Sequence, residues 1–177
     1  MPLTLYVLRH AKAESAPPPG GGDHERALRR RGRRAAQAVG RFLARLGETP
    51  ELVLSSTAVR ARETAEFAAR SGGWSAPIEL RRPIYEATTE RLLGEVASCE
   101  GEPQRVVLVG HQPGLSLLIA ELVGSEPDFP TGALAKIELD CARWSEVRAR
   151  SGRLAWLVTP EMIAALRRSA RVREREE

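Results

Sequence analysis

Residues 3–14 read LTLYVLRHAKAE. The opening run, residues 3–8, is short, apolar and rich in Leu, which is typical of a buried β-strand. Arg9 and His10 follow this run directly, at the point where the strand would end. The pair is either an ordinary polar strand end or a functional site that the strand holds in place. The rest of the chain has to distinguish these two interpretations.

The first strand belongs to an alternating series of strands and helices. Similar apolar runs occur at residues 52–54, 78–80, 106–109, 134–139 and 154–158. Apolar residues recur at helical spacing over residues 28–46, 57–71, 89–98 and 114–123, and a fifth helix is predicted after Thr159 and Pro160. Strands that alternate with amphipathic helices predict a mostly parallel sheet that is covered on both faces. We therefore expect an α/β fold, a three-layer α/β/α sandwich.

Length and composition indicate one folded domain. The chain has 177 residues, of which 42% are hydrophobic and 28% are charged, close to the values of globular proteins. We assign residues 1–166 to a single domain. The sequence RRSARVREREE, residues 167–177, is charged nearly throughout and is expected to fray.

The charge of the chain suggests anionic partners without identifying them. The formal net charge is +4, and almost all of the basic residues are arginines, which can reflect coding composition as much as binding. Residues 25–34, ERALRRRGRR, raise the question of a nucleic-acid contact. Their arginines fit the solvated face of a helix, and no stacking aromatic residues interleave them. We therefore predict no nucleic-acid partner.

The cysteine content and the hydropathy indicate the cellular compartment in which the protein is expected. Cys99 and Cys141 are the only two cysteines and lack metal-type spacing, which fits a reducing environment. No stretch approaches the roughly 18 consecutive apolar residues of a membrane span, and no basic region precedes the first apolar run. We expect a cytoplasmic protein without membrane contacts, and the sequence does not define its oligomeric state.

Candidate functional residues recur at the ends of the predicted strands. Arg60 lies just beyond the strand that ends in Ser-Ser, and His111 follows the run VVLVG. Ligands of open parallel sheets bind outside the carboxyl ends of the strands. His10 and His111 thus occupy equivalent places in two strand–loop–helix units, which favours a site over a polar strand end.

These residue types suit phosphoryl transfer. Arginine forks match phosphoryl oxygens, and a neutral imidazole is a competent nucleophile. Neighbouring arginines would disfavour a second positive charge and hold the pKa of His10 down. The segment GHQPGLS around His111 opens a helix whose free backbone N–H groups attract anions. This chemistry needs no metal or cofactor, and none is predicted.

The motifs together resemble the histidine phosphatase superfamily. LRHAKAE is followed by D-x-x-R-x-L-x-x-x-G, then by SSTAVRARETA and VLVGHQPGLS, in this order between about residues 3 and 160. PTGALAKIEL, residues 130–139, is similar to a segment of the SixA-type phosphohistidine phosphatases within that superfamily. The resemblance implies a phosphoglycerate mutase-like fold and a metal-independent phosphatase. It also implies that His10 forms a phosphohistidine intermediate while Arg9, Arg60 and His111 hold the phosphoryl group.

Further site residues rest on looser grounds. Glu86 in PIYEATTE is the candidate proton donor to the leaving group, because it follows the short strand at residues 78–80. Arg26, in the motif after the first loop, and Lys12, next to the Arg-His pair, are candidate substrate contacts. Ala11 stands where the superfamily usually has Gly, which raises the question of whether the backbone there can adopt the same shape. His24 is interpreted as a loop residue.

The expected substrate is phosphohistidine in a protein, since the short chain has no long insertion that would form a lid over the site. A small phosphorylated metabolite or a nucleotide is the alternative substrate. A non-catalytic basic module that binds anions or nucleic acid is the alternative from a different functional class, and a strong salt dependence of its affinity for DNA or RNA would reveal it.

Overall fold

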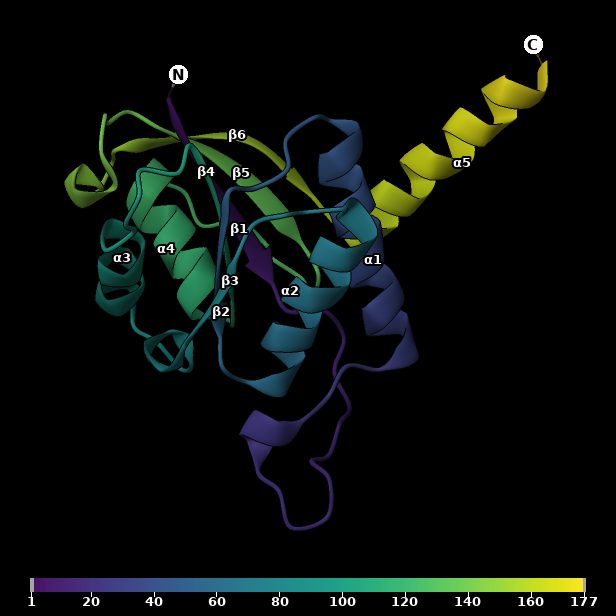
Figure 1. Cartoon of the computed structure of the whole chain (residues 1–177), viewed down its shortest axis with the longest axis horizontal. Coiled ribbons are helices and arrows are strands. Elements are labelled where there is room, and N and C mark those ends of the chain that lie inside the picture. Colours follow the sequence, from purple (N-terminus) through teal and green to yellow (C-terminus); the bar gives the residue numbers. More distant parts are fainter. Residues whose placement is uncertain (1, 177) are drawn as a thin grey trace.

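The computed structural model describes residues 2–176, with side chains to residue 169, and contains a six-stranded sheet (Figure 1). Its strands are β1 (Leu3–Arg9), β2 (Leu52–Ser56), β3 (Ile78–Arg81), β4 (Arg105–Gly110), β5 (Leu134–Leu139) and β6 (Gly152–Val158). The order across the sheet is β3-β2-β4-β1-β5-β6. Every predicted apolar run therefore lies in a strand, with bounds that differ by at most a few residues.

The sheet is parallel over its first four strands and antiparallel at one edge. β3, β2, β4 and β1 pair in parallel, whereas β5 runs antiparallel to β1 and β6 antiparallel to β5. Antiparallel neighbours can be joined without a helical crossover, and residues 140–151 between β5 and β6 hold only the short helix Trp144–Glu146. The prediction of a mostly parallel sheet is confirmed, with this antiparallel pair of strands as its exception.

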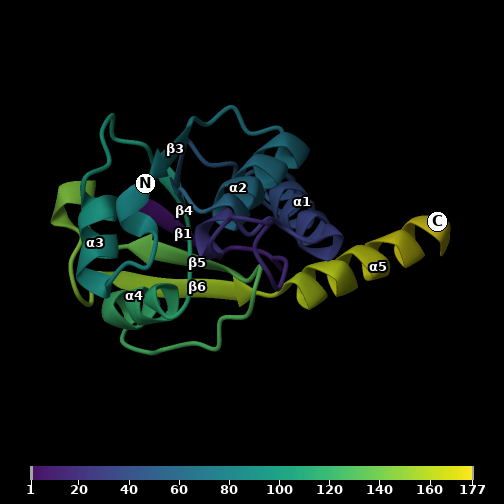
Figure 2. The same cartoon turned by 90° about the horizontal axis from the view of Figure 1, so that it is seen from below.

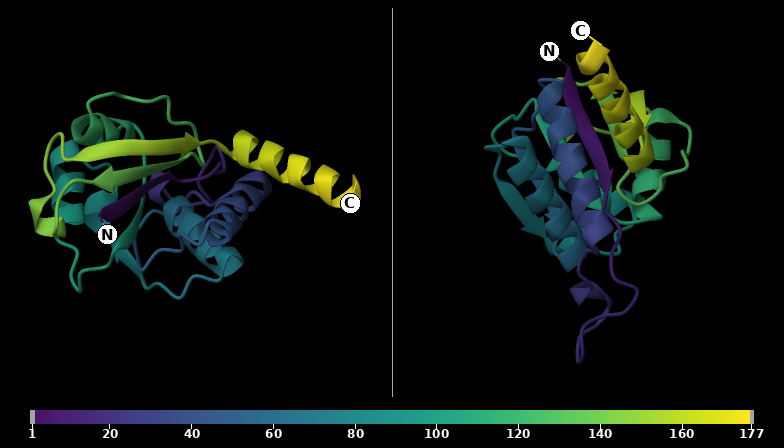
Figure 3. Two further views of the ribbon diagram at one scale, coloured as in Figure 1. Left: turned by 90° about the horizontal axis from the view of Figure 1, so that it is seen from above. Right: turned by 90° about the vertical axis from the view of Figure 1, so that its right-hand side faces the viewer.

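Helices cover both faces of the sheet (Figures 2 and 3). α1 (Arg30–Arg45), α2 (Val59–Gly72) and the start of α5 (Pro160–Glu176) lie on one face, and α3 (Thr89–Ala97) and α4 (Gly114–Val123) lie on the other. Successive side chains of β1 show the division: Leu5 and Val7 join the core under α3 and α4, and Tyr6 and Leu8 join the core under α1 and α2. The predicted three-layer sandwich is confirmed.

The C-terminal segment continues the last helix. α5 extends to Glu176 and leads away from the body of the molecule (Figure 1), and the fraying of residues 167–177 stays a prediction. The segment is rich in Arg and Glu, which have high helix propensity and can extend a helix that packing has already started. The last residue, 177, lies outside the described residues.

The loop after β1 is held against the domain at its base. Ala13 and Leu28 form an isolated antiparallel bridge that closes the loop. Gly32 of α1 lies so close to Lys12 that a Cβ atom there would meet the Lys12 carbonyl oxygen at 2.2 Å. This close approach explains the Gly of the motif D-x-x-R-x-L-x-x-x-G and brings the loop beside the ends of β1 and β2. No helix within residues 2–176 has the length and apolar character needed to cross a bilayer.

Candidate active site

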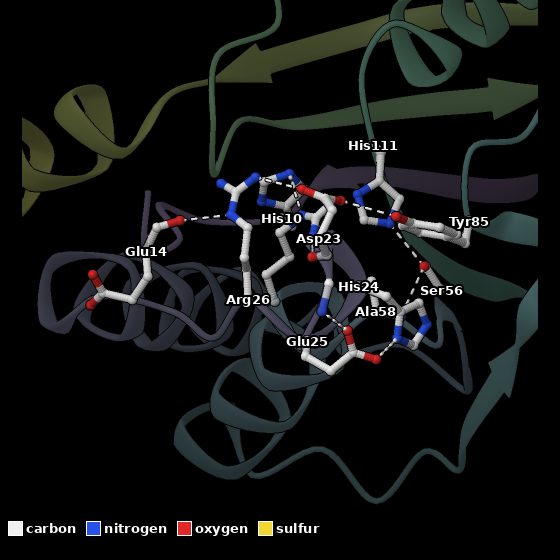
Figure 4. Close-up of polar contacts among 12 residues, drawn as sticks. His10, Glu14, Asp23, His24, Glu25, Arg26, Ser56, Ala58, Tyr85 and His111 are labelled. Atoms are coloured by element: carbon white, nitrogen blue, oxygen red, sulfur yellow. Dashed lines mark hydrogen bonds and ion pairs between the residues drawn. The ribbon is translucent and has the colours of Figure 1, made fainter. Parts of the chain in front are cut away.

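The carboxyl ends of β1, β2 and β4 meet at one edge of the sheet. Parallel pairing sets Arg9 at the end of β1 opposite Gly110 at the end of β4, so the residues that follow them are neighbours. The rings of His10 and His111 lie 5.1 Å apart between centroids, and Ser56 at the end of β2 reaches His111 (Figure 4). The structure thus brings together the three sequence motifs.

A hydrogen bond of the His10 ring defines which of its two nitrogens carries no proton. Nδ1 lies 2.9 Å from the carbonyl oxygen of Ala11. A carbonyl oxygen only accepts, so Nδ1 carries the proton of the neutral ring and Nε2 keeps an unshared electron pair. Nε2 accepts a hydrogen bond from Nε of Arg60 at 3.4 Å. His10 therefore presents an unprotonated nitrogen on the side of Arg60, where an anion would bind.

The environment of His10 keeps the ring neutral. Burial is the largest influence and lowers its pKa, the Ala11 hydrogen bond acts in the opposite sense, and nearby arginine charges lower it further, to about 4. The arginine effect predicted from the sequence is present, but burial exceeds it because the charged ring would lose its hydration. At neutral pH the nucleophilic form needs no prior deprotonation.

Arg60 lies in the first turn of α2 and is buried. Its Nη1 donates to the backbone oxygen of Asp23 at 2.7 Å, and its Nη2 donates to Oδ2 of the Asp23 carboxylate at 2.8 Å. A cation near a helix N-terminus is unfavourable with respect to the macrodipole, so a nearby anion offsets that cost. The guanidinium fork is therefore turned toward an anion site that a carboxylate of the same chain occupies.

Three side chains converge on that carboxylate (Figure 4). Besides Arg60, Nη1 of Arg26 donates to Oδ1 at 2.7 Å, and the Tyr85 hydroxyl donates to Oδ2 at 3.0 Å. Desolvation raises the pKa of Asp23, but these donors outweigh it and bring the pKa to about 2. Asp23 is consequently ionised at neutral pH.

His111 has one ring nitrogen without a partner. Its Nε2 lies 2.8 Å from Oγ of Ser56, and that oxygen already accepts the N–H of Ala58 at 3.2 Å. The Ser56 hydroxyl is then free to donate to Nε2, which leaves the proton of the neutral imidazole on Nδ1. Nδ1 is buried and has no hydrogen-bond partner among the described residues. Burial, with help from His10 and Arg60, lowers the pKa of His111 to about 3.

Arg9 and Ala11 complete the site around His10. Nη1 of Arg9 donates to the carbonyl oxygen of Phe129 at 2.9 Å, whereas its Nε is buried without a partner among the described residues. Ala11 is buried and its N–H donates to Oγ1 of Thr64 at 3.0 Å. Ala11 is not among the residues with positive φ, so its backbone does not require glycine. The departure from Arg-His-Gly is therefore accommodated without strain at this position.

Two predicted residues are not in contact with this cluster. Lys12 is exposed, and no hydrogen bond or ion pair of its side chain is found within the described chain. Glu86 is exposed, has φ 52°, and lines a hollow of 410 Å³ together with Arg82, Arg91 and Tyr85, the last of which it shares with the site. The roles of Lys12 in substrate binding and of Glu86 as proton donor stay predictions.

The structure also places residues at the site that sequence reasoning did not assign. Asp23 belongs to the motif D-x-x-R, which assigns it no role, and Tyr85 is the neighbour of Glu86, the predicted proton donor. His24, interpreted as a loop residue, lies 2.9 Å from Oγ1 of Thr57 through Nε2 and meets the edge of Tyr85 at 4.9 Å between centroids. Nothing in the local sequence marks His24, because contacts with distant residues define its position.

The two neutral imidazoles make the stability of the fold dependent on pH. Both have folded-state pKa values below the unfolded value of 6.5, so the unfolded chain binds protons more readily. The free energy of unfolding is therefore full above pH 6.5 and falls as the pH drops toward 4. We expect a loss of roughly 2 kcal/mol for each imidazole between pH 7.5 and 5. Urea unfolding at several pH values tests this, and a His10→Asn/His111→Asn variant with the same pH dependence would contradict it.

Within residues 2–176 no group of three or more His, Cys, Asp or Glu side chains is arranged as the ligands of a metal ion would be. Among the described residues of the site, Nε of Arg9 and Nδ1 of His111 have no hydrogen-bond partner, and the unprotonated Nε2 of His10 accepts from Nε of Arg60. Together they surround a position that suits a small oxyanion with an electrophilic centre.

Comparisons with known proteins agree with this chemistry. The sequence profile of the histidine phosphatase superfamily (branch 1) matches residues 5–97. An uncharacterized protein of Mycobacterium leprae is 31% identical over 166 residues, which cover 86% of this chain and 99% of that protein.

Solved structures show the same fold. A protein of Nakamurella multipartita, spelled multipartitia in its record and assigned as the phosphohistidine phosphatase SixA, is 28% identical with a TM-score of 0.79, over 90% of this chain and 97% of that one. The corresponding protein of Agrobacterium tumefaciens is 30% identical with a TM-score of 0.77, over 90% and 99%. A mycobacterial glucosyl-3-phosphoglycerate phosphatase, 17% identical with a TM-score of 0.63 over 86% and 96%, shares the fold alone.

Proposed function

The chain belongs to the histidine phosphatase superfamily, and from this premise we propose that it dephosphorylates phosphohistidine in a protein, with His10 as nucleophile. The observation that carries the proposal is the state of the His10 ring. Nδ1 donates to the carbonyl oxygen of Ala11, and Nε2 carries no proton and accepts a hydrogen bond from Nε of Arg60 at 3.4 Å. A neutral, oriented imidazole next to an arginine fork suits attack on phosphorus.

The reaction would proceed in two transfers at the same position. Nε2 of His10 attacks phosphorus, a P–N bond forms to His10, and the bond from phosphorus to the leaving group breaks. Water then attacks the same phosphorus, the P–N bond to His10 breaks, inorganic phosphate leaves, and Nε2 recovers its electron pair. Arg9 and Arg60 would hold the equatorial oxygens, and Nδ1–H of His111 would donate to one of them, because preorganised donors stabilise the charge that builds up there.

The state of the carboxylates favours a leaving group that needs little acid assistance. Asp23 is the carboxylate in contact with Arg60, and its pKa of about 2 leaves it without a proton at neutral pH. Glu86 is exposed and is not bonded to His10 or Arg60 within the described chain. The imidazole of phosphohistidine leaves more easily than an alkoxide, so this site suits it better than a sugar or alcohol phosphate.

A trapping experiment tests the nucleophile. The protein is pulsed with phosphoramidate, quenched in alkali, and the phosphate is located by mass spectrometry. We expect an acid-labile label on the peptide that contains His10, and its loss in His10→Gln. The matched control is His24→Gln, which removes the other imidazole of the loop and should leave the label on His10. Label that persists in His10→Gln would refute the assignment.

A substrate comparison tests the specificity. We expect kcat/KM on a histidine-phosphorylated protein to exceed that on p-nitrophenyl phosphate, sugar phosphates and nucleotides by at least about 100-fold, since only the former combines an easy leaving group with a protein surface. Higher activity on a small metabolite or nucleotide would replace the proposed substrate while leaving the phosphatase activity in place.

Asp23 occupies the arginine fork that the phosphoryl group needs, which gives a prediction for its substitution. In Asp23→Asn the competing charge is removed, and inorganic phosphate should inhibit about threefold to fivefold more strongly, because a partly exposed ion pair is worth up to about 1 kcal/mol. The inhibition constant is measured by competition at constant pH. Asp140→Asn, an exposed site on the loop after β5, is the matched control.

Weaker inhibition by phosphate in Asp23→Asn would contradict the competition and show that Asp23 positions Arg60 for the anion. A fall in kcat on phenyl phosphate, with kcat on phosphohistidine unchanged, would instead identify Asp23 as a proton donor to poor leaving groups. The corresponding Glu86→Gln measurement tests the residue that the sequence favoured for that role.

We also propose action without a metal, and a location in the cytoplasm. The site supplies the positive charge with arginine and imidazole groups, and activity that persists after dialysis against EDTA is expected. Cys99 and Cys141 are free thiols, and burial raises the pKa of both, as expected of unreactive cysteines in a reducing compartment.

A further inference from the structure

We propose that the groove between α1 and α5 docks an acidic amphipathic helix of a partner protein. The groove has a volume of 180 Å³, below the roughly 300 Å³ at which small-molecule sites begin, and so suits an anchoring side chain of a larger partner. The proposal goes beyond the phosphatase function, because the groove shares no residue with the site of His10 and its occupant is bound rather than turned over.

The floor of the groove is apolar and open to solvent. Phe42, Leu46 and Leu166 line it, and the side chains of Leu46 and Leu166 are 47% and 56% exposed. Ile163, beside them, is buried and fixes the start of α5 on the domain. Two exposed leucines that face one groove are typical of a surface that an apolar helix face covers.

The rim of the groove carries only positive charge. Arg41 and Arg45 of α1 and Arg167 of α5 line it, and no acidic residue is among the described lining residues. Nε of Arg41 is buried without a hydrogen-bond partner in the described chain. Burial lowers the pKa of Arg41, and the charges of Arg167 and Arg45 lower it further, which shows that the three cations repel one another. A carboxylate set between them would relieve this repulsion and satisfy Nε.

Charge and shape together select the occupant. A second copy of this chain would bring its own arginines against the rim, since α1 reads RRGRRAAQAVGRFLAR and contains no acidic residue. Nucleic acid would satisfy the arginines and leave the leucines exposed. An amphipathic helix with Leu at i, i+4 and Glu beside them fills the floor and pairs with the rim.

α5 links the docking surface to the catalytic edge of the sheet. α5 begins at Pro160, whose ring would lie 2.9 Å from a Cβ added at Gly132, and the N–H of Gly132 donates to the carbonyl oxygen of His10. The first turns of α5 contact α1 and line the groove with it, and the helix then leads away from the body of the molecule (Figure 3). Since α1 ends at Arg45 ahead of β2, the groove lies toward the amino ends of the parallel strands, and a partner held there would leave the site of His10 open.

Fluorescence anisotropy with a designed probe tests the proposal. The probe is a labelled peptide of about 18 residues with one face of leucines, glutamates beside them and alanines at the other positions, which limits repulsion between glutamates and favours a helix in water. A peptide of the same composition with its leucines spread over all faces, and a DNA duplex, serve as comparison ligands. We expect the amphipathic peptide to bind at least about tenfold more tightly than either.

Substitutions in the groove test whether the peptide binds there. Arg41→Gln/Arg45→Gln and, separately, Leu166→Ser should each weaken peptide binding about tenfold. Arg70→Gln/Arg91→Gln makes the same charge change at exposed positions on α2 and α3 and should alter it less than twofold. Urea unfolding of each variant confirms that it is folded.

Equal binding of the two peptides would overturn the proposal, as would tighter binding of DNA that the Arg41/Arg45 variant abolishes. A dimer in gel filtration that Leu166→Ser dissociates would assign the groove to a second copy instead. Since the readout is binding alone, none of these results depends on whether His10 is the nucleophile.

Discussion

Replacing His10 with Asn is expected to lower kcat at least about 10⁴-fold, because no group in the variant can form the covalent intermediate. Asn is chosen because its amide N–H can still donate to the carbonyl oxygen of Ala11, as Nδ1 of His10 does at 2.9 Å. The change therefore removes the nucleophilic Nε2, together with its hydrogen bond from Nε of Arg60, and keeps the other hydrogen bond of the side chain. Steady-state kinetics on a histidine-phosphorylated protein, with single-turnover measurements for the slow variant, give the ratio.

Anion binding distinguishes a lost nucleophile from a lost site. Arg9, Arg60 and His111 remain in His10→Asn, so the affinity for tungstate, measured by calorimetry, should change by less than about tenfold. His24→Asn is the matched control and should keep kcat within about tenfold, since no covalent step passes through His24. A His10→Asn variant that retains a tenth of the activity would require a different nucleophile.

Much of the fold follows from patterns that are local in the sequence. The strands and helices could be predicted because apolar residues alternate or recur at helical spacing, and because Pro and Gly separate these segments. The proximity of His10 and His111 could be predicted as well, since each directly follows a buried strand and parallel pairing brings the strand ends together. The antiparallel edge was not predicted, because the pairing partner of β5 depends on where the chain leads after α4.

The loop residues of the site could not be placed in this way. Asp23 reaches Arg60 because the loop is closed by Ala13 and Leu28 and its base is pinned by Gly32. These contacts join residues that are distant in the sequence, and no periodicity reports them. The position of Tyr85 illustrates the same limit, since the structure turns it toward Asp23 while its neighbour Glu86 is exposed.

Arg60 lies at a position where the helix dipole and the neighbouring histidines both disfavour a positive charge, which indicates a functional role. It lies in the first turn of α2, where the helix dipole disfavours a cation, and its charge lowers the pKa values of both His10 and His111. Asp23 offsets part of this cost through its carboxylate and its backbone oxygen. A buried arginine that needs an anion beside it in the resting protein is prepared to exchange that anion for a phosphoryl group.

Replacing Arg60 with Gln is accordingly expected to lower kcat/KM by about 10³-fold, the effect of removing a preorganised donor from a developing oxyanion. The pKa of His10 should rise at the same time, because Arg60 is the largest of the charges that lower it. The acid limb of the pH profile of kcat/KM would then move to higher pH. A variant that only disturbed the packing would leave this limb where it is.

The matched control is Arg60→Lys, which keeps the charge but loses the planar fork. We expect it to retain the low pKa of His10 and yet to recover less than about a tenth of kcat/KM, because a single ammonium group cannot bind two phosphoryl oxygens in fixed geometry. Full recovery in Arg60→Lys would show that charge alone is required. If Arg60→Gln lost less than tenfold, the phosphoryl group would have to be held elsewhere, and the cluster of His10, Arg60 and His111 would not be the active site.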